Sequence, residues 1–240
     1  MKLDQQNYLV IGGSKGIGAT IVNRLLNEGA SVYTVSRNQT IKIDNSIQHH
    51  LLLDVTSDDI SELQKFIPPI LHGVVYCPGT IDLKAFGSLK LVDFQNDLNI
   101  NFFGAIKVLQ ISLPALKKSE TGSVVLFSTI ATRIGLKFHS SIAAAKAALE
   151  GLAKSLAAEY ASARIRFNVI APSLTNTSLA ANFLASEEKR QMAASRHPLQ
   201  RFGEPADIAE LAVFLLTPQS SWITGQVIGV DGGMSAIRPL

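Results

Sequence analysis

The sequence is poor in the features that mark several classes of protein. It contains one cysteine, Cys77, among 240 residues, which excludes an internal disulfide and a cysteine-rich metal site. No apolar run approaches the roughly 20 residues that a membrane-spanning helix needs. The polar residues 1–7 lack the apolar segment of a signal peptide. We therefore expect a cytoplasmic enzyme or binding protein with no metal site and no membrane partner.

Charge is also scarce. Only 17% of the residues are charged, and the formal net charge of +3 is spread along the chain. Because no block of basic residues is present, a nucleic-acid partner is not expected. Apolar residues make up 47% of the chain, which is typical of a compact globular protein. With no internal repeat and no linker, residues 1–240 are predicted to form one domain.

Short apolar runs alternate along the chain with longer segments of helical spacing. This alternation is typical of a parallel sheet wound by crossover helices. The predicted strands cover residues 8–11, 31–36, 51–53, 73–77, 123–128, 166–171 and 226–230. The predicted helices cover residues 16–27, 91–116, 141–160 and 205–216.

A glycine-rich segment, GGSKGIG at residues 12–18, lies directly between the first predicted strand and the first predicted helix. Glycines in this place allow a sharp turn and let backbone N–H groups approach a pyrophosphate at the helix N-terminus. The context favours a dinucleotide site over the alternative, which is an ordinary tight turn.

The second predicted strand ends in Ser36 and is followed by Arg37, where an NAD site usually carries an acidic residue for the ribose hydroxyls. A guanidinium can instead pair with a 2′-phosphate through charge-assisted hydrogen bonds. Lys15, inside the glycine-rich segment, could reach the same phosphate. NADP(H) is therefore favoured over NAD(H), and the alternative is two solvated cations.

The segment SSIAAAK, residues 140–146, resembles the Tyr-x-x-x-Lys signature of the short-chain dehydrogenase/reductase family. The glycines at 12, 16 and 18 match the Gly-x-x-x-Gly-x-Gly spacing of that family. The resemblance implies a doubly wound Rossmann-type parallel sheet of about seven strands with helices on both faces, and a homodimer or homotetramer. In this family the tyrosine exchanges a proton and the lysine supports it. Here Ile142 stands in place of the tyrosine, and a hydrocarbon cannot exchange a proton.

The resemblance also implies a set of cofactor contacts, spread from the glycine-rich segment to the stretch after the sixth predicted strand: Gly12, Ser14, Lys15, Gly16, Ile17, Ser36, Arg37, Asp54, Val55, Gly79, Lys146, Pro172, Thr175 and Thr177. For Asp54 the alternative is that it caps the following helix. Tyr76-Cys77-Pro78-Gly79 keeps only the glycine of the family segment Asn-Asn-Ala-Gly. Because only 17 positions separate Arg37 from Asp54, the crossover helix between them is predicted to be very short or missing.

Four residues are candidates for the catalytic half of the site. Asn101 matches a family asparagine that holds a water linked to the lysine, and Thr129 matches a family serine that hydrogen-bonds a substrate carbonyl. Lys146 could bind the nicotinamide ribose or act as an acid itself. His139 precedes Lys146 by seven residues, a spacing that enoyl-thioester reductases of the superfamily use for their tyrosine. A histidine can donate a proton near neutral pH, although the alternative is a polar surface residue.

These features predict an NADP(H)-dependent oxidoreductase with an unusual proton donor. Its small-molecule substrate would carry a carbonyl, an alcohol or an enoyl group, under a lid at about residues 178–200. The alternative is a regulatory or scaffolding protein that binds a dinucleotide and has no catalytic activity.

Overall fold

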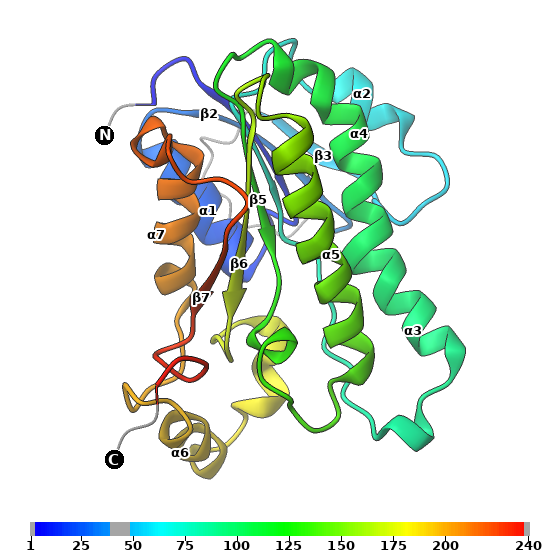
Figure 1. Ribbon diagram of the computed structural model, residues 1–240, viewed down its shortest axis with the longest axis vertical. Helices are drawn as coiled ribbons and strands as arrows, with labels where there is room; N and C mark the ends of the chain where they lie inside the picture. The colour runs from blue at the N-terminus through cyan, green and yellow to red at the C-terminus, as the bar shows by residue number, and fades with distance from the viewer. Residues whose placement is uncertain (1–2, 39–48, 238–240) are drawn as a thin grey trace.

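The computed structural model describes residues 3–38 and 49–237 and contains one sheet of seven parallel strands (Figure 1). The strands are β1 (Asn7–Ile11), β2 (Ser31–Ser36), β3 (His49–Leu52), β4 (Gly73–Tyr76), β5 (Ser123–Phe127), β6 (Arg166–Pro172) and β7 (Val227–Val230). Their order across the sheet is β3-β2-β1-β4-β5-β6-β7. The predicted fold class, a doubly wound parallel sheet, is confirmed.

Seven α-helices lie in the described part of the chain: α1 (Gly16–Asn27), α2 (Ser61–Phe66), α3 (Leu91–Leu98), α4 (Gly104–Lys117), α5 (Ser140–Glu159), α6 (Glu187–Ser195) and α7 (Pro205–Leu216). Shorter 3-10 helices occupy Phe86–Ser88, Ile130–Thr132, Ser178–Phe183 and Pro218–Ser220. In residues 3–38 and 49–237 no helix has the length and apolarity to cross a membrane. The connection predicted to lack a crossover helix lies largely at residues 39–48, outside the described residues.

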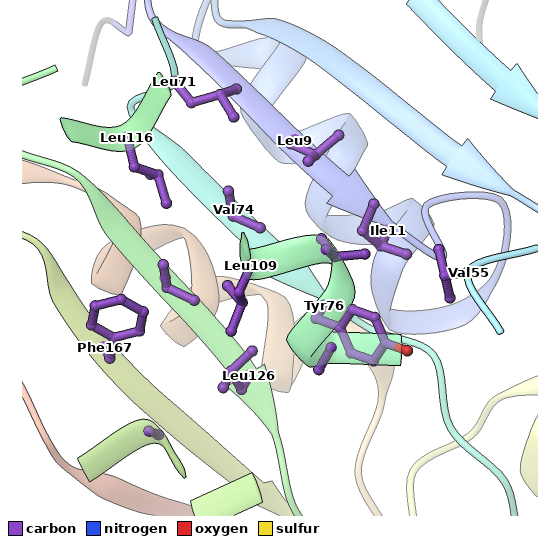
Figure 2. Packing of buried hydrophobic residues seen from close by; sticks show 14 of the residues in the cluster. Leu9, Ile11, Val55, Leu71, Val74, Tyr76, Leu109, Leu116, Leu126 and Phe167 are labelled. Carbon is purple, nitrogen blue, oxygen red and sulfur yellow. The ribbon is translucent and has the colours of Figure 1, made fainter. Parts of the chain in front are cut away.

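The helices cover both faces of the sheet because its strands alternate their side chains between the two faces. In β1, Leu9 and Ile11 pack into the core shared with α4 and α5 (Figure 2), whereas Tyr8 and Val10 pack into the core shared with α1 and α7. This is the two-residue period of a strand. Each such fully buried side chain contributes about 1.5–3 kcal/mol, so both faces of β1 hold the molecule together.

The strand order reverses between β1 and β4, which places a crevice outside the carboxyl ends of these two strands. Backbone hydrogen bonds between neighbouring strands continue past the ends of the strands. Gly12 N–H donates to the Val35 carbonyl at 2.8 Å, and Cys77 N–H donates to the Ile11 carbonyl at 3.0 Å. The segments that follow β1, β2 and β4 are therefore held next to one another.

The predicted helix over residues 91–116 is helical throughout, but it is not one regular α-helix. The chain passes from α3 through a π-helical turn, Asn99–Phe103, into α4. The turn lies against Tyr76 at the end of β4, whose hydroxyl donates to the Ile100 carbonyl at 2.6 Å. Such π-helical turns often occur at functional sites. Apolar spacing could not reveal this turn, because its partner lies in another element.

Replacing Gly104 with alanine is expected to destabilise the protein, although alanine normally favours a helix over glycine by about 1 kcal/mol. Gly104 has ordinary helical angles, with φ of −59° and ψ of −40°. An added Cβ atom would, however, overlap the hydroxyl oxygen of Tyr76 and lie 3.3 Å from the Asn99 carbonyl oxygen. We expect Gly104→Ala to lower the free energy of unfolding by about 1–3 kcal/mol in urea denaturation.

The matched control is Tyr76→Phe, which removes the hydroxyl and, by itself, one hydrogen bond of about 1 kcal/mol. In the Tyr76→Phe background, Gly104→Ala should cost much less than in the wild-type protein. If Gly104→Ala lowers the free energy of unfolding equally in both backgrounds, the Tyr76 hydroxyl is not what requires glycine at position 104.

Candidate functional site

The glycine-rich segment forms a tight loop between β1 and α1. Gly12 and Gly16 have φ values of +78° and +52°, in the left-handed region that favours glycine. At Gly18, an added Cβ atom would overlap the Gly12 carbonyl oxygen. The N-cap residue of α1, Lys15, makes no side-chain capping hydrogen bond. The N-terminus of α1 can therefore receive an anionic group, which its dipole favours.

A cleft of about 280 Å³ runs from this loop across the ends of β2 and β4. Most of the predicted cofactor residues line it, namely Gly12, Ser14, Lys15, Gly16, Ile17, Ser36, Arg37, Asp54, Val55, Gly79 and Thr177. Cys77 also lines the cleft, and burial raises the pKa of its thiol to about 12. The cleft has the position and the lining expected for a dinucleotide.

Asp54 and Arg37 both line the cleft near the end of β2. Burial opposes ionisation of the Asp54 carboxyl, but two hydrogen bonds from Thr56 and the charge of Arg37 outweigh it and lower the pKa. Asp54 accepts both bonds at Oδ1, from the Thr56 amide at 2.9 Å and its hydroxyl at 2.7 Å. The alternative role of Asp54 as a helix cap does not apply, because α2 begins only at Ser61.

Three predicted cofactor residues, Pro172, Thr175 and Lys146, do not line this cleft. Thr175 is 6% exposed, and its hydroxyl donates to the Ser173 carbonyl at 3.1 Å. Its backbone forms a bridge with Gly203. The Thr175 side chain thus contributes to the local fold of the chain after β6.

The predicted lid consists of the 3-10 helix Ser178–Phe183 and α6, at the lower end of the molecule in Figure 1. Two backbone hydrogen bonds join the segment before the predicted lid to the segment after it. The Asn176 N–H donates to the Gly203 carbonyl at 2.8 Å, and the Gly203 N–H donates to the Leu174 carbonyl at 3.0 Å. A second cavity, of about 640 Å³, separates the lid from the glycine-rich loop. Lys15 and Arg190 bring positive charge to its lining. The two hollows share Lys15, Gly16, Thr177 and Ser178 as lining residues.

Lys146 is buried in α5, with 6% of its surface exposed. Its neighbour one turn earlier, Ile142, is equally buried. Within residues 3–38 and 49–237, the Lys146 ammonium makes no direct hydrogen bond or ion pair. Burial lowers its pKa from 10.5 to about 8, and the charges of Cys77 and Asp97 act in the opposite direction. Lys146 can therefore gain and lose a proton near neutral pH.

Asn101 and Lys146 are brought together at Gly79. An added Cβ atom on Gly79 would lie 3.4 Å from Asn101 Oδ1 and 3.6 Å from Lys146 Nζ. The Asn101 amide nitrogen donates to the Asp97 carbonyl at 2.8 Å and to the Thr80 hydroxyl at 3.0 Å. Its Oδ1 atom is buried and has no hydrogen-bond partner in the described part of the chain. An unsatisfied buried acceptor beside a buried donor is suited to a polar ligand or a bridging water.

Thr129 and His139 lie before α5. Thr129 is half-buried, and its hydroxyl oxygen accepts the Ala131 N–H at 3.3 Å, which leaves the hydroxyl proton available for donation. His139 is also half-buried, with Nδ1 2.7 Å from the Lys137 carbonyl oxygen. Because a carbonyl only accepts, Nδ1 carries a proton and Nε2 is left for another partner.

Two residues that were not predicted from the sequence, Asp97 and Thr80, hydrogen-bond to the predicted residue Asn101. Asp97 had a usable signal. It precedes Asn101 by four residues, and side chains at that spacing lie on one helix face. Thr80 had none, because it meets α3 only in the folded chain.

The fold and the cleft define a Rossmann-type α/β protein with a site suited to a dinucleotide. A family model described as enoyl-(acyl carrier protein) reductase matches residues 12–235. A tropinone reductase homologue of Arabidopsis thaliana is 35% identical over 240 residues, covering 95% of this chain and 91% of that protein. The chain therefore belongs to the short-chain dehydrogenase/reductase family of oxidoreductases.

Solved structures agree with this assignment. A short-chain dehydrogenase/reductase of Mycobacterium ulcerans has a TM-score of 0.90 at 30% identity, covering 99% of this chain and 92% of that one. The structure of ElxO with NADP bound has a TM-score of 0.87 at 27% identity, covering 98% of this chain and 99% of that one.

The stability of Lys146→Met relative to the wild-type protein should depend on pH, because burying an ammonium is costly and methionine carries no charge. Below pH 8 the lysine is protonated in the folded and the unfolded state, and the folded state carries the full free-energy cost of burying the ammonium. As pH rises from about 8 towards 10.5, the folded state loses its proton first and the cost disappears. Urea denaturation should therefore show the free energy of unfolding of Lys146→Met, relative to that of the wild-type protein, higher at pH 7 than at pH 10.5 by up to about 3 kcal/mol.

Comparing the two proteins at each pH removes the contributions that both share, such as the titration of Tyr76. Lys154→Met is the matched control, since Lys154 is exposed on the same helix. It should show no such pH-dependent gain. A Lys146→Met difference that stays constant from pH 7 to 10.5 would argue against a lowered lysine pKa.

Proposed function

We propose that this protein is an NADP(H)-dependent oxidoreductase that acts on a carbonyl or alcohol group, or on an enoyl group, of a small molecule. The observation that carries this function is the buried Lys146 ammonium next to the unsatisfied Asn101 Oδ1, at the end of a dinucleotide cleft. Family membership supports the reaction class, and the NADP-bound relative supports the cofactor.

The residues of the cleft fit NADP(H). The N-terminus of α1 would hold the pyrophosphate, and Arg37 and Lys15 would pair with the 2′-phosphate. Gly79 leaves the end of β4 open beside Lys146, which would contact the nicotinamide ribose. The bound cofactor would supply or accept a hydride, the step that no side chain of the protein can perform.

The protein's own residues would handle the substrate oxygen and its proton. Thr129 would donate a hydrogen bond to the oxygen, and Lys146 would deliver the proton in reduction or take it in oxidation. Asn101 Oδ1 would hold a water that links Lys146 to solvent. His139 remains a second candidate donor. Because Ile142 cannot exchange a proton, Lys146 would act as the proton donor and acceptor.

We also propose that residues 1–240 act as one domain and that residues 178–200 close over the substrate. A cytoplasmic location and a homodimer or homotetramer remain predictions. The second candidate function, a dinucleotide-binding protein without catalysis, is favoured by one observation: the side chain in the tyrosine position, Ile142, is apolar and buried.

Reversing the charge of Arg37 should weaken NADPH binding and spare NADH. A charge-assisted contact is worth about 1.5–3 kcal/mol, so Arg37→Glu should raise the Kd for NADPH at least about tenfold. Both constants can be measured by quenching of protein fluorescence. Lys154→Glu, an equal charge change far from the cleft, should alter neither. Unchanged NADPH affinity in Arg37→Glu would refute the phosphate contact.

Turnover should depend on Lys146. The purified protein is mixed with NADPH and a panel of ketones, aldehydes and enoyl thioesters, and the NADPH absorbance is followed. Loss of general acid assistance should lower kcat about 10²–10⁴-fold in Lys146→Met, with a smaller change in NADPH affinity and none in Lys154→Met. NADPH binding without oxidation of any panel member by the wild-type protein would favour the binding-protein alternative.

A further inference from the structure

Asp97 is a second buried charged residue, its charge acts on Lys146, and the proposed reaction does not use it. Asp97, in α3, is 4% exposed. Its carboxylate accepts a hydrogen bond from the Thr80 hydroxyl at 2.5 Å. Burying a carboxylate is costly unless it is hydrogen-bonded and paired with a positive charge. Thr80 meets the first requirement, and a nearby cation would meet the second.

The contacts of Asn101 relate Asp97 to Lys146. Asn101 lies one helical turn after Asp97, and its amide nitrogen is bound both to the Asp97 carbonyl and to Thr80. The oxygen of the same amide faces Gly79, whose other neighbour is Lys146 Nζ. Asp97, Thr80, Asn101 and Lys146 thus form one polar cluster.

Cys77 and Glu150 are two other titratable groups on the elements around Lys146. Burial keeps Cys77 a neutral thiol at physiological pH. Glu150 lies one turn further along α5, and its Oε1 accepts the hydroxyls of Ser128 and Thr132 at 2.5 and 2.7 Å. In the described part of the chain, Asp97 is the carboxylate whose charge acts on Lys146.

We propose that Asp97 is a positioning residue of the active site, whose buried carboxylate, held by Thr80, keeps Lys146 as an ammonium ion where Ile142 stands in place of a phenol. A lysine surrounded only by apolar groups favours the neutral amine, which has no acidic proton to deliver. The negative charge of Asp97 makes the ammonium form of Lys146 the favoured one. The catalytic consequence rests on the proposed function, whereas the charge coupling itself does not.

The test is Asp97→Asn, which removes the charge but keeps the shape and an oxygen that can accept the Thr80 hydroxyl. The titration of Lys146 is followed by the ¹³Cε chemical shift in lysine-labelled protein, with the resonance assigned by its absence in Lys146→Met. The midpoint should fall by about one pH unit or more in Asp97→Asn. Asp97→Glu, which keeps the charge, should have a Lys146 midpoint close to that of the wild-type protein. An Asp97→Asn midpoint equal to that of the wild-type protein would overturn the assignment.

Asp82→Asn is the matched control. It removes an exposed carboxylate that pairs with Lys84 at 2.7 Å, and it should leave the Lys146 midpoint where it is. A shift as large as that of Asp97→Asn would mean that the effect is not specific to the buried cluster.

Folding and turnover provide two further readouts. If Asp97→Asn unfolds because Lys146 is left without a compensating negative charge, Asp97→Asn/Lys146→Met should fold. Failure of this double variant as well would show that Asp97 does not act through Lys146.

With a substrate, the alkaline limb of the kcat profile should move to lower pH in Asp97→Asn. The chemical-shift titration needs no turnover, so it separates this inference from a failure of the proposed activity.

Discussion

The parallel pairing of β1 with β2 on one side and with β4 on the other is the constraint on which the rest of the site depends. Parallel neighbours end at the same edge of a sheet, so the segments after these three strands must meet there. Hydrogen bonds from Gly12 and Cys77 to the adjoining strands extend the pairing beyond the strand ends. The helix N-terminus, the Arg37 cation and Gly79 consequently line one cleft.

Charge burial is the second constraint. Lys146 has a buried apolar neighbour, Ile142, one helical turn before it. Burial alone would favour a neutral amine at this position. The Asp97 carboxylate opposes that tendency, and the Thr80 hydroxyl and Asn101 amide connect the two residues. The pKa of Lys146 therefore depends on charged groups elsewhere in the fold as well as on its own burial.

The sequence predicted much of the fold because its evidence is local. The bounds of α1 and α7 agree with the predicted ranges, and the seven predicted strands lie within two residues of the observed ones. The glycine-rich segment needs its glycines for its own backbone angles and for a contact only six residues away, between Gly18 and Gly12. These features follow from periodicity and short spacing, which a single sequence displays directly.

Other features depend on contacts between distant parts of the chain. The π-helical turn lies against Tyr76, 24 residues before Ile100, and Thr175 faces a segment about 28 residues further on. The sequence by itself determined the order of strands and helices, the glycine-rich loop and the apolar residue one turn before Lys146. Only the tertiary structure decided which polar groups share the space around Lys146, because desolvation and charge depend on distances that packing sets.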